Sequence, residues 1–271
     1  MVTAASPHRE HSTVARAAPL VFAILQILVP ILPSLGFGQP IGDQSDSVRT
    51  LITPAGWAFS IWGALYTGSL VFAVYQALPA QRDNTLLARI RWPAAGAFLG
   101  NAVWALYTQS FGLSAVSAVI ILCTLICLLR IVRVFAAWDI PFSAGERWCA
   151  FLPLSALASW LTVASVVNIA ASLRYHGVEG GNLTAIISAS VVLVAGLIAA
   201  AALISARGNL PYALVFLWAL SAIYAAGGAR AAPVAAAAGI AALLVIAGAL
   251  IGWRRSGAAS ATVRRAPSAS Y

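Results

Sequence analysis

The sequence contains no lysine, and charged residues make up only 8% of its 271 positions. Soluble domains carry about 25% charged residues, so this chain lacks the charge that a water-exposed surface requires. Hydrophobic residues make up 61% of the chain, and its mean hydropathy is +0.90. This composition excludes a soluble globular protein and predicts an integral membrane protein.

Acidic residues and histidines are also scarce. The seven acidic residues and the three histidines all lie outside the apolar stretches of the sequence. Ionisable side chains inside a membrane are costly and usually mark proton or ion coupling. Their absence argues against a proton-driven pump, and it removes both a buried acid–base pair and a histidine ligand for haem iron. A P-loop is excluded as well, because that motif needs a lysine.

Cysteine is rare, too. Cys123, Cys127 and Cys149 form no CxxC pair and have no histidine beside them in the sequence. We interpret them as small buried apolar side chains rather than as a metal or redox site.

Long apolar segments dominate what is present. A segment of about 20 residues crosses a hydrocarbon core of roughly 30 Å. Eight such segments are found: 18–37, 55–78, 93–110, 113–135, 149–173, 183–206, 209–227 and 231–253. They predict an all-α, polytopic membrane helix bundle, with a cytoplasmic tail at 1–17 and a basic tail at 254–271, both disordered.

The arginines test this topology. If the N-terminus is cytoplasmic, 13 arginines lie on the cytoplasmic side, and only Arg49, Arg174 and Arg230 lie on the other side. This asymmetry favours eight spans with both termini in the cytoplasm. The net charge of +9 thus reflects membrane topology, and we expect no nucleic-acid partner. Arginine without lysine, with an alanine-rich C-terminal third, is typical of a GC-rich bacterial genome, so we expect a bacterial cell membrane.

Three of the spans carry aromatic and neutral polar side chains on one helical face. The i, i+3, i+4, i+7 and i+8 spacings place these residues together: Phe59, Trp62 and Tyr66; Asn101, Trp104 and Thr108; Trp160, Ala164 and Asn168. Converging faces of this kind predict a cavity for a flat, mostly apolar ligand. The alternatives are that the asparagines hold helices together, that the tryptophans fill the core, and that Trp57 belongs to an interfacial aromatic belt.

These motifs resemble those of a known family. Residues 54–66, PAGWAFSIWGALY, resemble the second-helix signature of the TspO/MBR family, the tryptophan-rich sensory proteins related to the mitochondrial translocator protein. Residues 101–104 resemble its third-helix N-x-x-W, and residues 160–168 resemble its fifth-helix W-x3-A-x3-N. The resemblance covers residues 18–175. It identifies a longer, eight-span branch, in which residues 183–253 form a three-helix membrane extension.

The resemblance implies a five-helix core that encloses a pocket, with the segment from Gly38 to Thr53 as its lid. Family members bind porphyrins and other tetrapyrroles, so a porphyrin or haem is the implied ligand, and no cofactor is required. The implied pocket residues are Trp57, Trp62, Asn101, Trp104, Trp160, Ala164 and Asn168, and Phe59 and Tyr66 complete the aromatic face. Ala55 replaces the second proline of the signature. Sterol binding is disfavoured, because no arginine follows Tyr175 within five residues.

Two main functions follow. The first is a membrane receptor or sensory protein that binds a hydrophobic, planar small molecule. The second is a transporter or permease component for a small apolar solute, without proton coupling. An enzyme such as a light-dependent porphyrin-degrading protein ranks lower, because no set of acid, base, metal ligand or nucleophile supports turnover. A purely structural membrane protein and a homodimer are both left open.

Overall fold

The computed structural model describes the backbone of residues 13–265 and the side chains of residues 13–256. This part of the chain is helical and contains no strand, which confirms the predicted all-α fold. In chain order, the elements are α1 (Thr13–Leu28), η1 (Val29–Leu35), α2 (Ile41–Ser47), η2 (Gly56–Ser60), α3 (Ile61–Ala77), η3 (Pro79–Gln81), α4 (Thr85–Phe111), α5 (Ala115–Ala136), α6 (Ala144–Glu146), η4 (Arg147–Phe151), α7 (Leu152–Tyr175), η5 (Gly181–Leu183), α8 (Thr184–Ser205), α9 (Leu210–Ile223), η6 (Tyr224–Gly228) and α10 (Ala232–Arg265).

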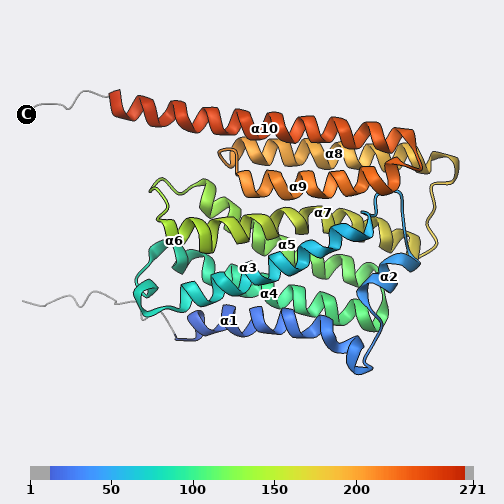
Figure 1. Ribbon diagram of the computed structural model, residues 1–271, viewed down its shortest axis with the longest axis horizontal. Coiled ribbons are helices and arrows are strands. Elements are labelled where there is room, and N and C mark those ends of the chain that lie inside the picture. The colour runs from blue at the N-terminus through green and yellow to red at the C-terminus, as the bar shows by residue number, and fades with distance from the viewer. Residues whose placement is uncertain (1–12, 266–271) are drawn as a thin grey trace, which may run out of the picture.

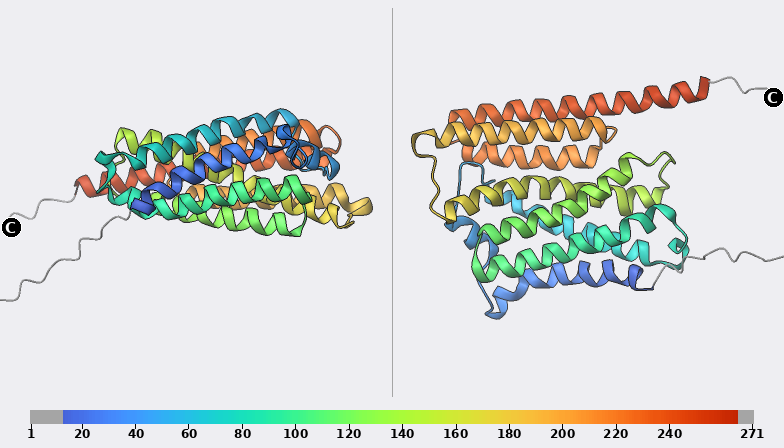
Figure 2. Two further views of the ribbon diagram at one scale, coloured as in Figure 1. Left: turned by 90° about the horizontal axis from the view of Figure 1, so that it is seen from below. Right: turned by 180° about the vertical axis from the view of Figure 1, so that it is seen from behind.

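The long helices run side by side in one bundle (Figure 1). Helices α1, α3, α4, α5 and α7 form a five-helix core, and α8, α9 and α10 pack beside it (Figure 2). Helix α9 joins the two parts, because the Ser159 hydroxyl of α7 donates to the Tyr212 carbonyl at 2.7 Å, and the Tyr212 hydroxyl donates to Thr162 at 2.9 Å. The three-helix extension is therefore held to the core by buried polar contacts as well as by apolar packing.

Seven of the described helices are long and apolar enough to cross a membrane, so the chain is a multi-pass membrane protein. The other long helix, α4, has 27 residues, which gives a length of about 40 Å and is sufficient for a span. Its mean hydropathy is lowered by polar side chains such as Asn101, Thr108 and Gln109. All three are buried inside the bundle, so α4 is polar toward the protein interior.

Helix α4 begins at Thr85, earlier than the predicted boundary at residue 93. Asn84 caps it, because its side chain accepts a hydrogen bond from the Leu87 amide at 3.0 Å. The early start brings Arg91 into the helix, where its side chain is only 1% exposed. Its guanidinium donates to Gln76 Oε1 at 3.1 Å and to the Gln81 carbonyl at 2.8 Å. This buried arginine therefore lies within the helix, just before the predicted apolar segment that begins at residue 93.

The helices also extend into the predicted tails. Helix α1 begins at Thr13, and α10 continues to Arg265. The predicted disorder is thus wrong for 13–17 and for 254–265, because alanine and arginine are strong helix formers that continue a helix past its apolar part. The remaining tail residues, 1–12 and 266–271, lie outside the described part of the chain.

Helix α1 begins and α10 ends at the same end of the bundle (Figure 1). The lid with Arg49, the end of α7 with Arg174 and the turn before α10 with Arg230 lie at the opposite end. This arrangement agrees with an even number of crossings, and which end faces the cytoplasm stays a prediction.

Small residues let α8 and α10 approach closely. A Cβ atom at Gly248 would lie 2.6 Å from the Ala200 carbonyl oxygen, and one at Gly196 would lie 2.6 Å from the Ala241 Cβ. Close backbone approach over small residues is a common way for helices to associate within a membrane. The alanine-rich and glycine-rich C-terminal sequence therefore determines how tightly this helix pair packs.

Candidate functional site

A cavity of about 60 Å³ lies at the end of the bundle opposite the termini. The residues around it come from the lid segment, from α3 and its preceding turn, from α4, and from α7. They are Ile41, Ser45, Pro54, Phe59, Trp62, Trp104, Leu113, Trp160, Val163, Ala164, Val167, Asn168 and Ala171. Six of the nine residues singled out from the sequence thus line one cavity.

The aromatic wall of the cavity is built from three different helical segments. Trp62 stacks on Trp104 with ring centroids 6.5 Å apart and an interplanar angle of 23°. Trp160 meets Trp62 edge to face at 6.0 Å and 86°, and it meets Phe59 at 6.0 Å and 90°. Offset and edge-to-face contacts of this kind are the favourable arrangements for aromatic rings. The aromatic side chains of the wall therefore pack on one another around the cavity.

Two indole nitrogens of this wall have no hydrogen-bond partner. Trp104 Nε1 and Trp160 Nε1 are buried, and neither donates to another atom of the described residues. An indole N–H is a donor only, and buried polar groups are nearly always paired. Both tryptophans belong to the cavity wall, so this wall holds two buried donors that have no acceptor among the described residues.

Asn168 is the polar residue of α7 at the cavity. Its Oδ1 accepts a hydrogen bond from the Ser117 hydroxyl of α5 at 3.0 Å. This bond fixes the orientation of the amide, and its Nδ2 makes no hydrogen bond to the described residues. Asn168 therefore serves both roles weighed from the sequence, since it ties two helices together and also borders the cavity.

Three of the predicted residues do not line the cavity. Asn101 is buried and donates to Gln26 Oε1 of α1 at 3.1 Å, which is the interhelical role considered as an alternative. Trp57 is half-exposed and packs edge to face on Trp218 of α9, with centroids 4.8 Å apart. Tyr66 lies one turn beyond Trp62 and packs on its ring at 5.0 Å. Trp57 thus contacts the extension, and Tyr66 supports the wall from behind.

The segment between α1 and α3 covers the cavity. Gly36 and Gly38 turn the chain with φ angles of 88° and 76°, a region that favours glycine. The Gln39 amide then donates to the Gln109 carbonyl at 2.8 Å, which places α2 over the cavity with Ile41 and Ser45 facing it. This segment matches the lid that the resemblance implies.

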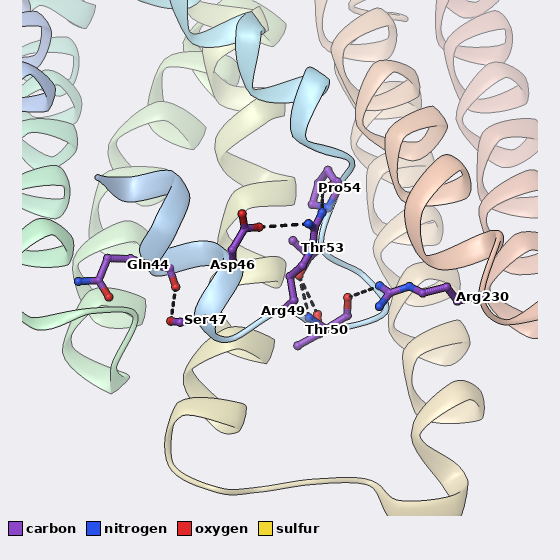
Figure 3. A network of polar contacts seen from close by, with 8 residues as sticks. All are labelled: Gln44, Asp46, Ser47, Arg49, Thr50, Thr53, Pro54 and Arg230. Carbon is purple, nitrogen blue, oxygen red and sulfur yellow. Dashed lines mark hydrogen bonds and ion pairs between the residues drawn. The ribbon is translucent and has the colours of Figure 1, made fainter. Parts of the chain in front are cut away.

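The far end of the lid is held by the C-terminal extension. The Arg230 guanidinium donates to the Thr50 carbonyl at 3.1 Å, and the Ala55 amide donates to the Ala222 carbonyl at 3.1 Å. Within the lid, Arg49 pairs with Asp46 at 3.1 Å, as Figure 3 shows together with the Arg230 contact. No local sequence signal pointed to this attachment, because it joins residues about 180 positions apart.

Two further spaces adjoin the cavity. A void of about 20 Å³ shares Val163 and Val167 with it, and a groove of about 650 Å³ between α7 and α8 shares Ile52 and Val166 with that void. We call this larger space the α7–α8 groove. The lid residues from Arg49 to Ile52 border the groove, and Pro54 borders the cavity, so this short segment lies between the two spaces.

The sequence reasoning missed Val163, Val167 and Ala171 of α7. They continue the helical period that begins at Trp160, so extending the Trp160–Ala164–Asn168 pattern by its neighbouring positions would have found them. The lid residues Ile41 and Ser45 carry no such signal, because their position depends on how the chain folds back over α4.

A family model described as "TSPO-like protein" matches residues 14–251. No curated protein and no solved structure gives a match. The matched region includes α8, α9 and most of α10, so the similarity extends well beyond residue 175, where the resemblance of the motifs ended. Among the described residues, no group of three or more His, Cys, Asp or Glu side chains could hold a metal ion.

Proposed function

Because the chain belongs to the TSPO-like protein family, we propose that it binds a flat, mostly apolar ligand of the tetrapyrrole type in the aromatic cavity. The observation that carries this proposal is the pair of buried, unpartnered indole N–H groups of Trp104 and Trp160 at the cavity. A ligand with a planar ring and a few oxygen or nitrogen acceptors would stack on the aromatic wall and accept from these donors. In this function the protein is a membrane-embedded receptor or sensor.

The size of the cavity sets a condition on this function. Pockets for ligands of this class measure about 300 to 1,000 Å³, whereas the cavity measures about 60 Å³. A tetrapyrrole therefore binds only after the lid has moved outward and the aromatic side chains have separated. The ligand-free arrangement is a closed one.

The cost of opening the lid follows from its attachments. The lid is held by the hydrogen bonds from Gln39 to Gln109, from Arg230 to Thr50 and from Ala55 to Ala222. At about 0.5 to 1.5 kcal/mol each, breaking all three costs about 2 to 4 kcal/mol. A ligand with nanomolar affinity for the open form gains about 12 kcal/mol, so binding readily offsets this cost.

The test is a titration of the purified full-length protein with protoporphyrin IX, followed by the absorbance of the porphyrin. Trp104→Phe and Trp160→Phe keep an aromatic ring but remove the indole donor. We expect each to weaken binding by about two- to tenfold, which corresponds to the loss of one hydrogen bond. The matched control is Trp253→Phe, because Trp253 is exposed on α10 and does not line the cavity. If folded Trp104→Phe and Trp160→Phe variants both bind as the wild type does, the proposal is wrong.

A second candidate function is the facilitated passage of a small apolar solute. The observation that favours it is that the cavity, the void and the α7–α8 groove lie in series, with shared residues between each space and the next. A flux measurement in proteoliposomes distinguishes the two functions, because a receptor binds its ligand without moving it across the bilayer.

A further inference from the structure

The α7–α8 groove gathers all three arginines found at its end of the bundle in the described part of the chain. Arg49 comes from the lid, Arg174 from the end of α7, and Arg230 from the turn before α10. They are far apart in the sequence, yet each lines the same groove. Glu179 lines the groove as well, so the charged side chains around it are three arginines and one glutamate.

The three arginines differ in how they are neutralised. Arg49 pairs with Asp46 at 3.1 Å, and Arg174 pairs with Glu179 at 2.7 Å. Arg230 has no carboxylate partner among the described residues, within which its guanidinium donates to the Thr50 and Ala226 carbonyls. Asp46 and Glu179 neutralise two of the three arginines, so the surplus positive charge at the groove is that of Arg230. The two ion pairs are partly exposed, so an incoming anion exchanges with them at little cost.

The walls of the groove are apolar and open to the outside of the bundle. Ile169 and Leu173 of α7 face the groove from one side, and Ile187 of α8 faces it from the other. All three are half-exposed. In a membrane-spanning bundle, such side chains contact the hydrocarbon of the lipids. The groove thus combines a hydrocarbon-facing channel with a cationic rim at the level of the loops.

We propose that the α7–α8 groove binds an anionic lipid of the surrounding bilayer. The phosphate group of the lipid contacts Arg230 and Arg174, and one acyl chain lies between α7 and α8 along Leu173 and Ile187. Arginine suits this role because its planar guanidinium matches the oxygens of a phosphate in a bidentate manner. A volume of about 650 Å³ accommodates a headgroup and part of a chain.

The lipid would also act on the lid. Arg230 holds the Thr50 carbonyl, and a phosphate at Arg230 competes with that carbonyl for the same guanidinium. The residues from Arg49 to Ile52 separate the groove from the cavity, so a bound headgroup loosens the segment that closes the cavity.

The test measures lipid binding by native mass spectrometry of the full-length protein released from mixed micelles. Phosphatidylglycerol and phosphatidylcholine with the same two oleoyl chains are compared. We expect the wild type to prefer phosphatidylglycerol. Arg230→Gln should lower its affinity about tenfold, and the double variant Arg174→Gln with Arg230→Gln about a hundredfold. Binding of phosphatidylcholine should be unchanged in these variants.

Arg207→Gln is the matched control. Arg207 pairs with Asp139 at 2.6 Å and is 46% exposed, compared with 2.7 Å and 47% for Arg174, but it lies at the other end of the bundle. An equal loss in Arg207→Gln would overturn the proposal, because it would show a general effect of charge. Equal affinity of the wild type for the two lipids would also overturn it. A thermal unfolding curve for each variant ensures that only folded protein is compared.

Two further ligands test whether the site binds a bilayer lipid or another molecule that carries a similar anionic group. Glycerol 3-phosphate carries the anionic group without a chain, and oleate carries a carboxylate on a single chain. We expect glycerol 3-phosphate at millimolar concentration to leave phosphatidylglycerol bound, and oleate to compete weakly. Displacement by glycerol 3-phosphate would show a site for a free anion, and tighter binding of oleate would show a fatty-acid site. Either result would overturn the assignment to a bilayer lipid.

Ser188→Phe tests the channel separately from the charges. Ser188 lines the groove on α8 and is not part of the arginine group, so a larger side chain there occupies the place of the acyl chain. We expect weaker binding of phosphatidylglycerol, and unchanged porphyrin binding in the aromatic cavity when no phosphatidylglycerol is present. Unchanged lipid binding by the folded variant would contradict the proposed path of the acyl chain.

Discussion

The packing of α8 against α10 yields a quantitative prediction for Gly248→Ala. The added Cβ would lie 2.6 Å from the Ala200 carbonyl oxygen and 2.8 Å from the Ala200 Cα. Ordinary contact begins at 3.4 Å, so the two helices would have to separate by about 0.8 Å. The Ala200 atoms that the added Cβ would contact belong to the backbone, so they cannot rotate away as a side chain could. Overpacking of this kind costs about 1 to 3 kcal/mol.

Gly239→Ala on the same helix is the control, because a Cβ there meets no atom within 4 Å. Both substitutions make the same gain in helix propensity, about 1 kcal/mol, so this contribution cancels in the comparison. We expect Gly248→Ala to be less stable than Gly239→Ala by about 1 to 3 kcal/mol.

The assay is unfolding of the purified protein by sodium dodecyl sulfate in mixed micelles, followed by near-ultraviolet circular dichroism. The free energies of unfolding of the two variants are compared at the same detergent fraction. If the two variants unfold at the same fraction, α8 and α10 do not approach as closely as the structure indicates, and the reasoning fails.

Two further substitutions test the placement of residues around the cavity. Asn101→Ala breaks the buried contact to Gln26, so we expect a loss of about 1 kcal/mol in unfolding free energy. We expect the porphyrin affinity to be unchanged. A clear fall in affinity with unchanged stability would place Asn101 in the binding site instead. Gly227→Ala places a methyl group against the Leu51 carbonyl of the lid. Because the methyl group pushes the lid away from this contact, we expect faster porphyrin uptake in a stopped-flow measurement. An unaltered rate would show that this contact does not hold the lid closed.

The closed cavity gives the C-terminal extension a specific part in the proposed function. The lid is attached at one end to Gln109 of the core and at the other to Ala222 and Arg230 of the extension. Trp57 and Trp218 add an aromatic contact between the same two parts, and the Trp218 indole donates to the Ala58 carbonyl at 3.2 Å. The extension thus holds the segment that covers the cavity, although none of the residues of the extension lines the cavity.

Arg91 shows where sequence patterns are misleading. A hydropathy pattern ends a predicted span at an arginine, because it considers only the free-energy cost of placing the charge inside the membrane. In the fold, the Gln76 side chain at the end of α3 and the Gln81 carbonyl of η3 accept from the guanidinium. These partners lower the cost of burial, so the helix begins before the arginine and not after it.

The sequence by itself determined the class of protein, its helical spans to within several residues, and its family. The class and the spans follow from composition and hydropathy, which are local, and the family follows from the resemblance of three short motifs. It also indicated an aromatic cavity, because Trp62, Trp104 and Trp160 each lie on a helical face with neutral polar or small neighbours.

Only the tertiary structure decided which of these faces meet. Trp62, Trp104 and Trp160 converge, whereas the face of Asn101 turns toward Gln26 of α1, and Trp57 turns toward α9. It also decided that Arg49, Arg174 and Arg230 line one groove, since their proximity depends on how α7, α8 and the lid pack. The direction in which a helical face points is set by contacts with distant parts of the chain, and periodicity within one helix contains no information about them.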